Sequence, residues 1–492
     1  MNLYSRFERA FSQALDKPAL VLGDAPDWTY AHLKGQAELA AGALAAAGVA
    51  PGDRVLVQLP KLPETVALYL ACLKVGAVYV PVNTAYTPRE VAYFIEDSEP
   101  RLFLATDPDA GSGGVQVETL AESGGSWRTR LAEAEPVQDT IGRDDEDLAA
   151  ILYTSGTTGR AKGAMLSHNN LASNVLALDR YWGWQDDDVL LHALPIFHVH
   201  GLFVALHCAF LRATPVIFQP RFDVDALIAE LPNATVLMGV PTFYTRLLAD
   251  PRFDAALASG MRLFVSGSAP LTEQTFVEFE ARTGKRILER YGMTETLMNT
   301  SNPLDGERVA GSVGFALPRI EARIASEDGQ VLAPGEVGGI EVRGENVFSG
   351  YWRMPERTAE EFRGDGFFRT GDLGVMDAEG RFSIVGRAKD LVISGGYNVY
   401  PKEVERLLDE MPEVTESAVI GVPHPDFGEA VVAVLVAAEG VSEGRVDVHL
   451  RGNLARYKQP KRVLCVDELP RNAMGKVQKN ELRERYSDLF TA

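Results

Sequence analysis

Helix-like and strand-like apolar patterns alternate up to about residue 310, and this alternation limits the possible folds more than any other feature. Residues 30–48 show helical periodicity, residues 53–59 read as a strand, and residues 64–76 show helical periodicity again. Further strand-like segments follow at residues 101–106, 148–152, 189–192, 215–218, 234–240 and 263–268. Strands that are separated by helices usually lie parallel in a shared sheet. We therefore predict an α/β fold with largely parallel strands.

The pattern changes after about residue 310 to short strands with tight turns. Residues 320–324 and 339–343 alternate apolar and polar side chains, and residues 377–380 are predicted to turn a hairpin. A helix with one apolar stripe is predicted to begin at Pro401, because proline suits a first helical turn. We expect a large N-terminal domain over residues 1–388, ending in a β-rich subdomain, and a small α+β domain over residues 389–492.

Composition and charge argue against several classes of function. A chain of 492 residues with 46% hydrophobic and 24% charged side chains is expected to form two or more globular domains. No apolar run reaches the roughly 18 residues that span a bilayer, and the N-terminus lacks the apolar core of a signal peptide. The net charge of −20 opposes binding to nucleic acids and to anionic membranes.

Cysteine usage suggests a reducing compartment. Cys72, Cys208 and Cys465 are far apart and lie in apolar segments, so three buried free thiols are predicted and a cytoplasmic location is expected. Residues 107–146 are rich in Gly, Ser, Asp and Glu, and we expect them to form a variable, exposed segment.

The loop over residues 153–163 combines small hydroxyls, glycines and two cations directly after the strand-like run 148–152. Such a loop suits an oligophosphate, because glycines let backbone N–H groups approach the oxygens while hydroxyls and Lys162 or Arg160 supply hydrogen bonds and charge. It does not match the Walker A spacing. We expect it to lead through residues 163–166 to a helix capped by Ser167. A polar surface loop is the alternative, with about equal weight for this segment alone.

Four further segments are weak signals when each is taken alone. Residues 289–296 combine an aromatic ring, a glycine and a carboxylate; the alternative is a turn at a helix start. Asp372 and Arg387 face each other across the predicted hairpin, where a plain salt bridge is the alternative. Residues 391–401 contain a Gly-Gly corner between a predicted strand and helix, and residues 470–479 place a lysine after a glycine in a polar loop. Most such corners are ordinary turns and most such lysines are solvated.

Together, in this order and at these separations, the five segments resemble the adenylate-forming superfamily of acyl-CoA synthetases, luciferases and nonribosomal adenylation domains. The resemblance covers roughly residues 15–485. One departure is Arg160-Ala161-Lys162, where a proline commonly precedes the lysine. The resemblance implies that a carboxylate attacks ATP to give an acyl-adenylate and pyrophosphate. Coenzyme A then displaces AMP.

The resemblance also implies roles for individual residues. Catalytic roles are implied for Lys476, Glu295, Thr154 and His198, with Mg²⁺ flanked by Thr154 and Glu295. The implied ATP-binding residues are Thr154, Ser155, Gly156, Thr157, Thr158, Gly159, Lys162, Gly267, Ser268, Ala269, Tyr291, Gly292, Met293, Thr294, Asp372, Arg387 and Lys476. Tyr291 is expected to stack on adenine, and Asp372 and Arg387 to hold the ribose.

The small C-terminal domain is expected to rotate between the two half-reactions. Lys389 lies near the implied hinge, and Gly395 and Gly396 are implied to line the route of coenzyme A. Acetylation of Lys476 would remove the charge needed for adenylation and is a hypothetical off-switch.

Cationic residues in the acyl-site segments point to a dicarboxylate. Arg246 and Arg290 fall in segments that line this pocket in the superfamily, where His198 is implied to gate it. The segments look close to malonyl-CoA synthetases, which implies malonate as the acid. Arg246, Ser268 and Arg290 are then expected to hold its distal carboxylate, while Val199 and Met298 border its α-carbon. Threonine is usual at the Val199 position, so acceptance of methylmalonate is left open.

Three alternatives stay open on sequence grounds. Arg246 could merely pair with Asp250 one helical turn away. The enzyme could then be a short-chain or aryl monocarboxylate–CoA ligase. A carrier protein could replace coenzyme A as acceptor, or the chain could be an inert nucleotide-binding scaffold. The joint presence of Glu295, Asp372, Arg387 and Lys476 argues against the scaffold.

Overall fold

Two large, mainly parallel sheets form the framework of the protein in the computed structural model, which describes residues 1–490 except 24, 112, 155–160, 439, 452 and 473–474. The first sheet has the order β15 (Phe315–Ala316), β14 (Leu297–Ser301), β13 (Ile287–Met293), β12 (Leu263–Ser266), β11 (Val236–Gly239), β9 (Leu190–His192), β10 (Val216–Phe218), β1 (Pro18–Val21) and β2 (Trp28–Thr29). The second has the order β18 (Gly350–Tyr351), β8 (Lys162–Ser167), β7 (Leu148–Thr154), β4 (Val78–Pro81), β3 (Arg54–Gln58), β5 (Leu102–Ala105) and β6 (Gln116–Thr119). The expected α/β class with parallel strands is confirmed, because β9 to β13 and β3 to β7 pair in parallel.

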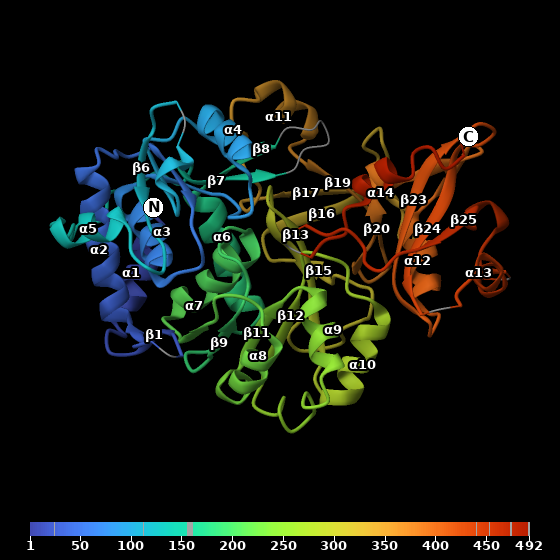
Figure 1. Cartoon of the computed structure of the whole chain (residues 1–492), viewed down its shortest axis with the longest axis horizontal. Coiled ribbons are helices and arrows are strands. Elements are labelled where there is room, and N and C mark those ends of the chain that lie inside the picture. The colour runs from blue at the N-terminus through green and yellow to red at the C-terminus, as the bar shows by residue number, and fades with distance from the viewer. Residues whose placement is uncertain are drawn as a thin grey trace.

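Helices connect and cover these strands (Figure 1). Their bounds are α1 (Tyr4–Ser12), α2 (Tyr30–Ala46), α3 (Pro63–Val75), α4 (Pro88–Ser98), α5 (Ser126–Glu133), α6 (His168–Tyr181), α7 (His207–Arg212), α8 (Val224–Glu230), α9 (Pro241–Ala249), α10 (Glu273–Thr283), α11 (Pro355–Glu361), α12 (Pro401–Asp409), α13 (Glu443–Leu450) and α14 (Lys479–Arg485). A π-helical turn, η2 (His200–Leu206), precedes α7.

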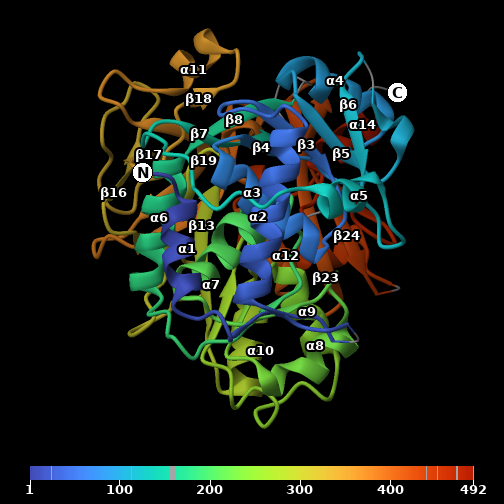
Figure 2. The same ribbon diagram turned by 90° about the vertical axis from the view of Figure 1, so that its left-hand side faces the viewer.

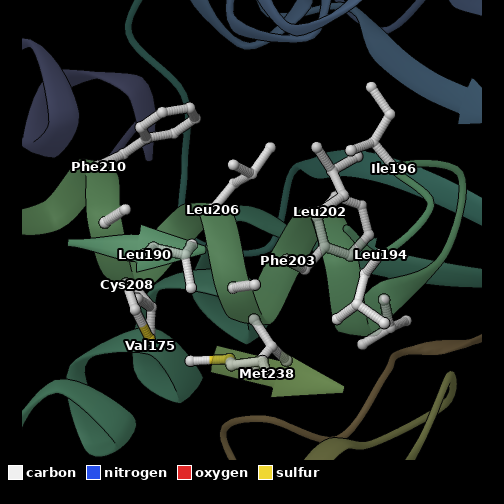
Figure 3. Packing of buried hydrophobic residues seen from close by; sticks show 14 of the residues in the cluster. Val175, Leu190, Leu194, Ile196, Leu202, Phe203, Leu206, Cys208, Phe210 and Met238 are labelled. Atoms are coloured by element: carbon white, nitrogen blue, oxygen red, sulfur yellow. The ribbon is translucent and has the colours of Figure 1, made fainter. Parts of the chain in front are cut away.

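Helix α3 is buried within the framework and forms part of its apolar core. Every residue from Thr65 to Val75 is buried, as its nearly unbroken apolar sequence requires. The one cation in that stretch, Lys74, donates to the Gln138 carbonyl at 2.7 Å and to Glu8 at 3.1 Å. Helices α1, α2 and α3 are seen together in the turned view (Figure 2). One apolar cluster includes side chains from both sheets, and Figure 3 shows the part around η2, α7 and β9.

A four-stranded antiparallel sheet follows the two large sheets, as expected for the β-rich subdomain. Its order is β16 (Ile320–Ala325), β17 (Gly338–Gly344), β19 (Phe368–Met376) and β20 (Phe382–Arg387). The predicted hairpin joins β19 to β20, and its register sets Asp372 directly opposite Arg387. The α/β class with a β-rich section is thus confirmed.

The C-terminal part has a sheet and apolar clusters of its own at the right of Figure 1. Its strands are β21 (Val392–Ser394), β22 (Tyr397–Val399), β23 (Val414–His424), β24 (Gly428–Ala437) and β25 (Arg462–Cys465). Helix α12 packs its predicted stripe of Val404, Leu407, Leu408 and Met411 into this core. Pro401 stands at its first position, as expected.

Three sequence expectations were wrong in detail. Residues 107–146 are not wholly exposed, because β6 forms the edge of a large sheet and Trp127 of α5 is fully buried. Cys72 and Cys208 are buried thiols, but Cys465 is exposed, because it is the last residue of the edge strand β25. Residues 163–166 belong to strand β8 and not to a lead-in to α6. Over the described part of the chain, no helix has the length and apolar character that crossing a bilayer requires.

Candidate active site

The cation-bearing loop joins two antiparallel strands, β7 and β8. Their register pairs Thr154 with Lys162 across the hairpin. Helix α6 follows β8, and Ser167 caps it by accepting from the Asn170 N–H, as expected. The loop itself, including Ser155, Gly156, Thr157, Thr158 and Gly159, lies outside the described residues. What the structure fixes are the two sides of the loop, from which Thr154 and Lys162 project.

Lys162 is a desolvated cation. Its ammonium lies 4.0 Å from the centre of the Tyr351 ring and 3.7 Å from Glu361 of α11. Burial lowers the pKa of Lys162, although Glu361 and Glu295 oppose that shift. Little water surrounds this charge, so an anion placed beside it would be attracted more strongly than at the surface.

Glu295 is a buried carboxylate close to this cation. It accepts from the Thr154 hydroxyl at 3.3 Å and from the Tyr351 hydroxyl at 3.1 Å, and burial raises its pKa. In the described ranges, no three His, Cys, Asp or Glu side chains are grouped closely enough to hold a metal ion. Mg²⁺ usually takes one or two carboxylates and fills its other positions with water and substrate phosphates. The pair Glu295 and Thr154 therefore fits a nucleotide-borne Mg²⁺ rather than a protein-enclosed one.

Tyr291, Asp372 and Arg387 form one connected group. The Tyr291 hydroxyl donates to the Asp372 carboxylate at 2.6 Å, and Arg387 Nε lies 3.0 Å from the other oxygen of that carboxylate. The Asp372 charge raises the pKa of Arg387. Gly292 allows the bulge beside Tyr291, because a Cβ there would lie 1.9 Å from the Leu297 carbonyl oxygen. Met293 and Thr294, also predicted to contact ATP, end β13 and begin the turn to β14.

Asp372 and Arg387 therefore form the salt bridge that was the alternative, and they are also the two residues expected to bind the ribose. A cleft of about 1120 Å³ opens beside Asp372 and Gly371. It is otherwise lined by β16, β17, β19 and α11, and it does not include Glu295 or Lys476.

Arg290 is the most unusual charge in this region. Its side chain is 3% exposed, and its Nε and Nη2 groups have no hydrogen-bond partner within the described part of the chain. Burial lowers the pKa of Arg290 to about 9. Its neighbour Glu289 does not pair with it, because successive side chains of a strand face opposite sides. The guanidinium packs against Gly267, where a Cβ would lie 2.5 Å from Arg290 Cζ.

The other acid-pocket residues predicted from sequence are Ser268, His198, Val199 and Met298, and the Arg290 charge acts on His198. Ser268 follows Gly267 after the end of β12, and Ala269 comes next. His198 is partly buried, and its pKa falls to about 4 because of burial and the charges of Arg290 and Lys476. Val199 directly precedes the η2 turn and Met298 lies in β14; both are 2% exposed. The charges of Arg290 and Lys476 therefore both act on the His198 ring.

Arg246 differs from Arg290. It lies exposed on α9, with its guanidinium 5.7 Å from the centre of the Phe222 ring. The alternative of an ion pair with Asp250 is wrong, because Asp250 pairs with Arg252 and Arg246 has no ion pair among the described residues. The structure neither buries Arg246 nor gives it another ionic partner.

Lys476 reaches this region from the C-terminal part. Its backbone N–H donates to Asn472 Oδ1 at 3.0 Å, and the preceding Gly475 packs near Thr242 of α9. Burial and the nearby Arg387 lower the pKa of Lys476 to about 8, against the opposing charge of Asp372. Lys389, at the implied hinge, lies in a short turn between β20 and β21, and burial lowers its pKa as well.

Gly395 and Gly396 form a two-residue hairpin turn between β21 and β22, with φ of 59° and 81°. The expected corner between strand and helix was therefore wrong: a second short strand intervenes before α12. Both positions need glycine because L residues rarely adopt these angles. The turn is exposed, and the Gly395 N–H donates to the Phe427 carbonyl at 2.9 Å within the C-terminal sheet.

The contacts that Tyr351, Glu361 and His200 make with other residues of the site were not predicted from the sequence. Tyr351 touches both Lys162 and Glu295, and Glu361 approaches Lys162. His200 was noticed only as the second histidine of its motif, but its Nδ1 lies 3.2 Å from Ser268 Oγ. The available signals were the neighbouring Gly-Tyr-Trp segment and the closely spaced histidines; neither reveals a partner far away in sequence.

Known proteins resemble this chain over almost its whole length. The family model for AMP-binding enzymes matches residues 7–352, and that for the AMP-binding enzyme C-terminal domain matches residues 403–476. The crystal structure of ATP-bound MatB from Rhodopseudomonas palustris is 53% identical with a TM-score of 0.96, and it covers 100% of both chains.

Two curated relatives are named as CoA ligases of different acids. The indoleacetate–CoA ligase of Aromatoleum aromaticum is 38% identical over 477 residues, covering 93% of both chains. The mitochondrial malonate–CoA ligase of Mus musculus is 39% identical over 452 residues, covering 83% of this chain and 77% of the relative. These matches confirm the resemblance to adenylate-forming enzymes. The chain is a member of the AMP-binding enzyme family and an AMP-forming, ATP-dependent acyl-CoA ligase.

Proposed function

We propose that the protein is a malonate–CoA ligase, which converts malonate, ATP and coenzyme A to malonyl-CoA, AMP and pyrophosphate through malonyl-adenylate. The observation that carries this proposal is the buried Arg290 guanidinium without a partner among the described residues. Removing a charge from water without pairing it costs several kcal/mol. A second carboxylate on the substrate would pair with this charge, whereas a monocarboxylate would leave it unpaired.

Neighbouring groups favour the same acid. Ser268 contacts His200, and the Arg290 charge lowers the pKa of His198. The buried Val199 and Met298 would supply apolar walls for a short carbon spacer. Arg246 is proposed as a second, more exposed contact for the distal carboxylate. Relatives named malonate–CoA ligase in Mus musculus and Arabidopsis thaliana support this substrate. The indoleacetate and feruloyl ligases among the relatives keep a monocarboxylate as the second candidate.

The first half-reaction brings a carboxylate against a triphosphate, so charge neutralisation and orientation should dominate catalysis. We propose that Lys162 and the loop before it hold the β- and γ-phosphates, and that Tyr291, Asp372 and Arg387 hold adenosine. Lys476 would bridge the attacking carboxylate and the α-phosphate. Mg²⁺, held by Glu295 and Thr154 together with the phosphates, would supply further positive charge when bound.

The second half-reaction is proposed to use a different placement of the C-terminal part. We divide the chain into domains at residues 388 and 389, with Lys389 at the hinge. Rotation would withdraw Lys476 and bring the Gly395–Gly396 turn to the site, where the absence of side chains leaves room for the pantetheine arm of coenzyme A. His198 would gate the pocket between the steps. Val199 and Met298 would decide whether methylmalonate is also accepted.

Substrate choice tests the proposal directly. ATP–pyrophosphate exchange should be strong with malonate and weak with acetate and octanoate. Arg290→Met should lower kcat/KM for malonate about 10²- to 10³-fold, because it removes one partner of a buried charge pair. The same change should preserve or raise the thermal stability of the ligand-free protein, since it removes an unpaired buried charge.

Two matched variants serve as controls for that substitution. Arg246→Met should cost less than Arg290→Met, because Arg246 is exposed, and Arg180→Met on the exposed side of α6 should leave exchange unchanged. Exchange with octanoate but not with malonate would exclude the dicarboxylate assignment.

Lys476 is expected to act in the first half-reaction and not in the second. Lys476→Ala should abolish adenylation, because it removes the bridging cation, yet thioester formation from preformed malonyl-adenylate should largely survive. Single-turnover measurements of each step check this. Unchanged production of malonyl-CoA from malonate, ATP and coenzyme A by Lys476→Ala would contradict this role of Lys476.

The pH dependence of adenylation should report the lowered pKa of Lys476. The charged form exists below a pKa of about 8 and is lost above it, so the adenylation rate should fall as pH rises from 8 to 10. An ordinary lysine would stay charged to about pH 10. The Lys476→Arg variant should shift this fall to higher pH, because the ordinary pKa of a guanidinium is higher than that of an ammonium. A wild-type profile that is flat to pH 10 would contradict this assignment.

A further inference from the structure

A buried histidine touches the hydroxyl that we assign to the acid pocket. His200 is 1% exposed, and its Nδ1 lies 3.2 Å from Ser268 Oγ. Its other ring nitrogen, Nε2, is buried and has no hydrogen-bond partner in the described ranges. Burial, Arg290 and the neighbouring histidines all lower the pKa of His200, so the ring is neutral at physiological pH. A neutral ring carries one N–H, and its position decides what Ser268 can do.

The fold holds His200 in place independently of any ligand. His200 begins the π-helical turn η2, and π-turns often occur at functional sites. The next residue, Gly201, packs so closely that a Cβ would lie 2.1 Å from the Pro195 carbonyl oxygen. Its own carbonyl lies 2.9 Å from His192 Nε2. Two contacts thus fix the backbone directly after His200.

Ser268 is held in an uncommon conformation. Its φ of 70° lies in the left-handed region, which non-glycine residues seldom adopt and which costs of order 1–3 kcal/mol. The preceding Gly267 packs against the Arg290 guanidinium. The strained backbone therefore holds the Ser268 hydroxyl beside His200, next in sequence to the glycine that packs against Arg290.

The two tautomers of His200 have different consequences. With the hydrogen on Nε2, a buried N–H would lack a partner, and Nδ1 would accept the only hydroxyl hydrogen of Ser268. With the hydrogen on Nδ1, the ring donates to Ser268 Oγ, and only a lone pair on Nε2 stays unpaired. Orphaned buried N–H groups are rarer in proteins than under-satisfied acceptors. The second tautomer is therefore favoured, and it leaves the Ser268 O–H free to donate.

We propose that His200 is a positioning residue for acid selection: as the Nδ1–H tautomer it donates to Ser268 Oγ and so directs the Ser268 hydroxyl hydrogen to the distal carboxylate of the substrate. This inference rests on the proposed malonate–CoA ligase activity and deepens it. Arg290 supplies charge to that carboxylate, and the His200–Ser268 pair supplies a directed hydrogen bond that a monocarboxylate cannot use.

Amide substitutions distinguish the two ring nitrogens. His200→Asn puts an N–H donor near the Nδ1 position, whereas His200→Gln puts it near Nε2. We expect His200→Gln to raise KM for malonate roughly 10- to 100-fold, as for a lost hydrogen bond to a charged group, with KM for ATP unchanged. His200→Asn should restore most of the wild-type KM. Activity with propionate should not fall in either variant.

A double-mutant cycle with Ser268→Ala identifies the route of the effect. If His200 acts through Ser268, then His200→Gln should cost nothing further once Ser268 is alanine. His207→Gln is a matched control, because His207 is buried at the end of the same turn but contacts Tyr69 at 2.7 Å. It should change thermal stability without a malonate-selective change in KM.

The outcomes separate this inference from the proposed function. Wild-type protein without malonate-dependent exchange would reject the proposed function itself. If malonate is the substrate, equal effects of Asn and Gln at His200, additive effects with Ser268→Ala, or equal losses for malonate and propionate would each overturn the inference. If His200→Gln does not fold, nitrogen-15 NMR of histidine-labelled wild-type protein tests the proposal by identifying the tautomer of His200. The proposal requires the hydrogen on Nδ1. A hydrogen on Nε2 would refute it.

Discussion

The desolvation of cations is the physical constraint on which this site depends. Lys162, Arg290, Arg387 and Lys476 come from four separate segments and converge in a chain whose net charge is −20. Burial lowers the pKa of Lys162, Arg290 and Lys476, and the charge of Arg387 lowers that of Lys476 further. The overall negative field repels anions, so only such a local concentration of positive charge can hold a triphosphate and a carboxylate together.

The fold brings the four cations from different elements, so that no single segment carries all of the buried positive charge. Lys162 follows the β7–β8 hairpin, Arg290 lies in β13, Arg387 ends β20, and Lys476 comes from the C-terminal part. Asp372 and Glu295 partly neutralise the group and are themselves fixed by the hydroxyls of Tyr291, Tyr351 and Thr154. Arg290 is the exception, because no described carboxylate pairs with it directly and its Nε and Nη2 groups have no hydrogen-bond partner there. Its missing partner is what we assign to the second carboxylate of malonate.

The sequence predicts those parts that depend on local pattern. The α/β alternation, the Ser167 cap, the hairpin that pairs Asp372 with Arg387 and the apolar stripe of α12 all follow from spacing over short stretches. Strand β8 was missed because its six residues also fit a lead-in to a helix. The exposure of Cys465 was missed because an apolar segment at a sheet edge reads like one at its centre.

The site itself was only partly predictable, because its chemistry depends on burial and on contacts between distant segments. No local pattern shows that Arg290 is buried without a partner while Arg246, assigned to the same pocket, is exposed. Nor does it show that His200 meets Ser268. The family resemblance named the residues, and the structure supplies the difference between the two arginines.

The most direct test of this account compares malonate with malonamate, its neutral monoamide of nearly identical shape, as substrates for adenylation. Both retain one carboxylate to be activated, so only the charge at the distal end differs. We predict that kcat/KM favours malonate by about 10³-fold or more in the wild-type enzyme, and that Arg290→Met removes most of this preference. Equal use of the two acids by the wild-type enzyme would contradict the account.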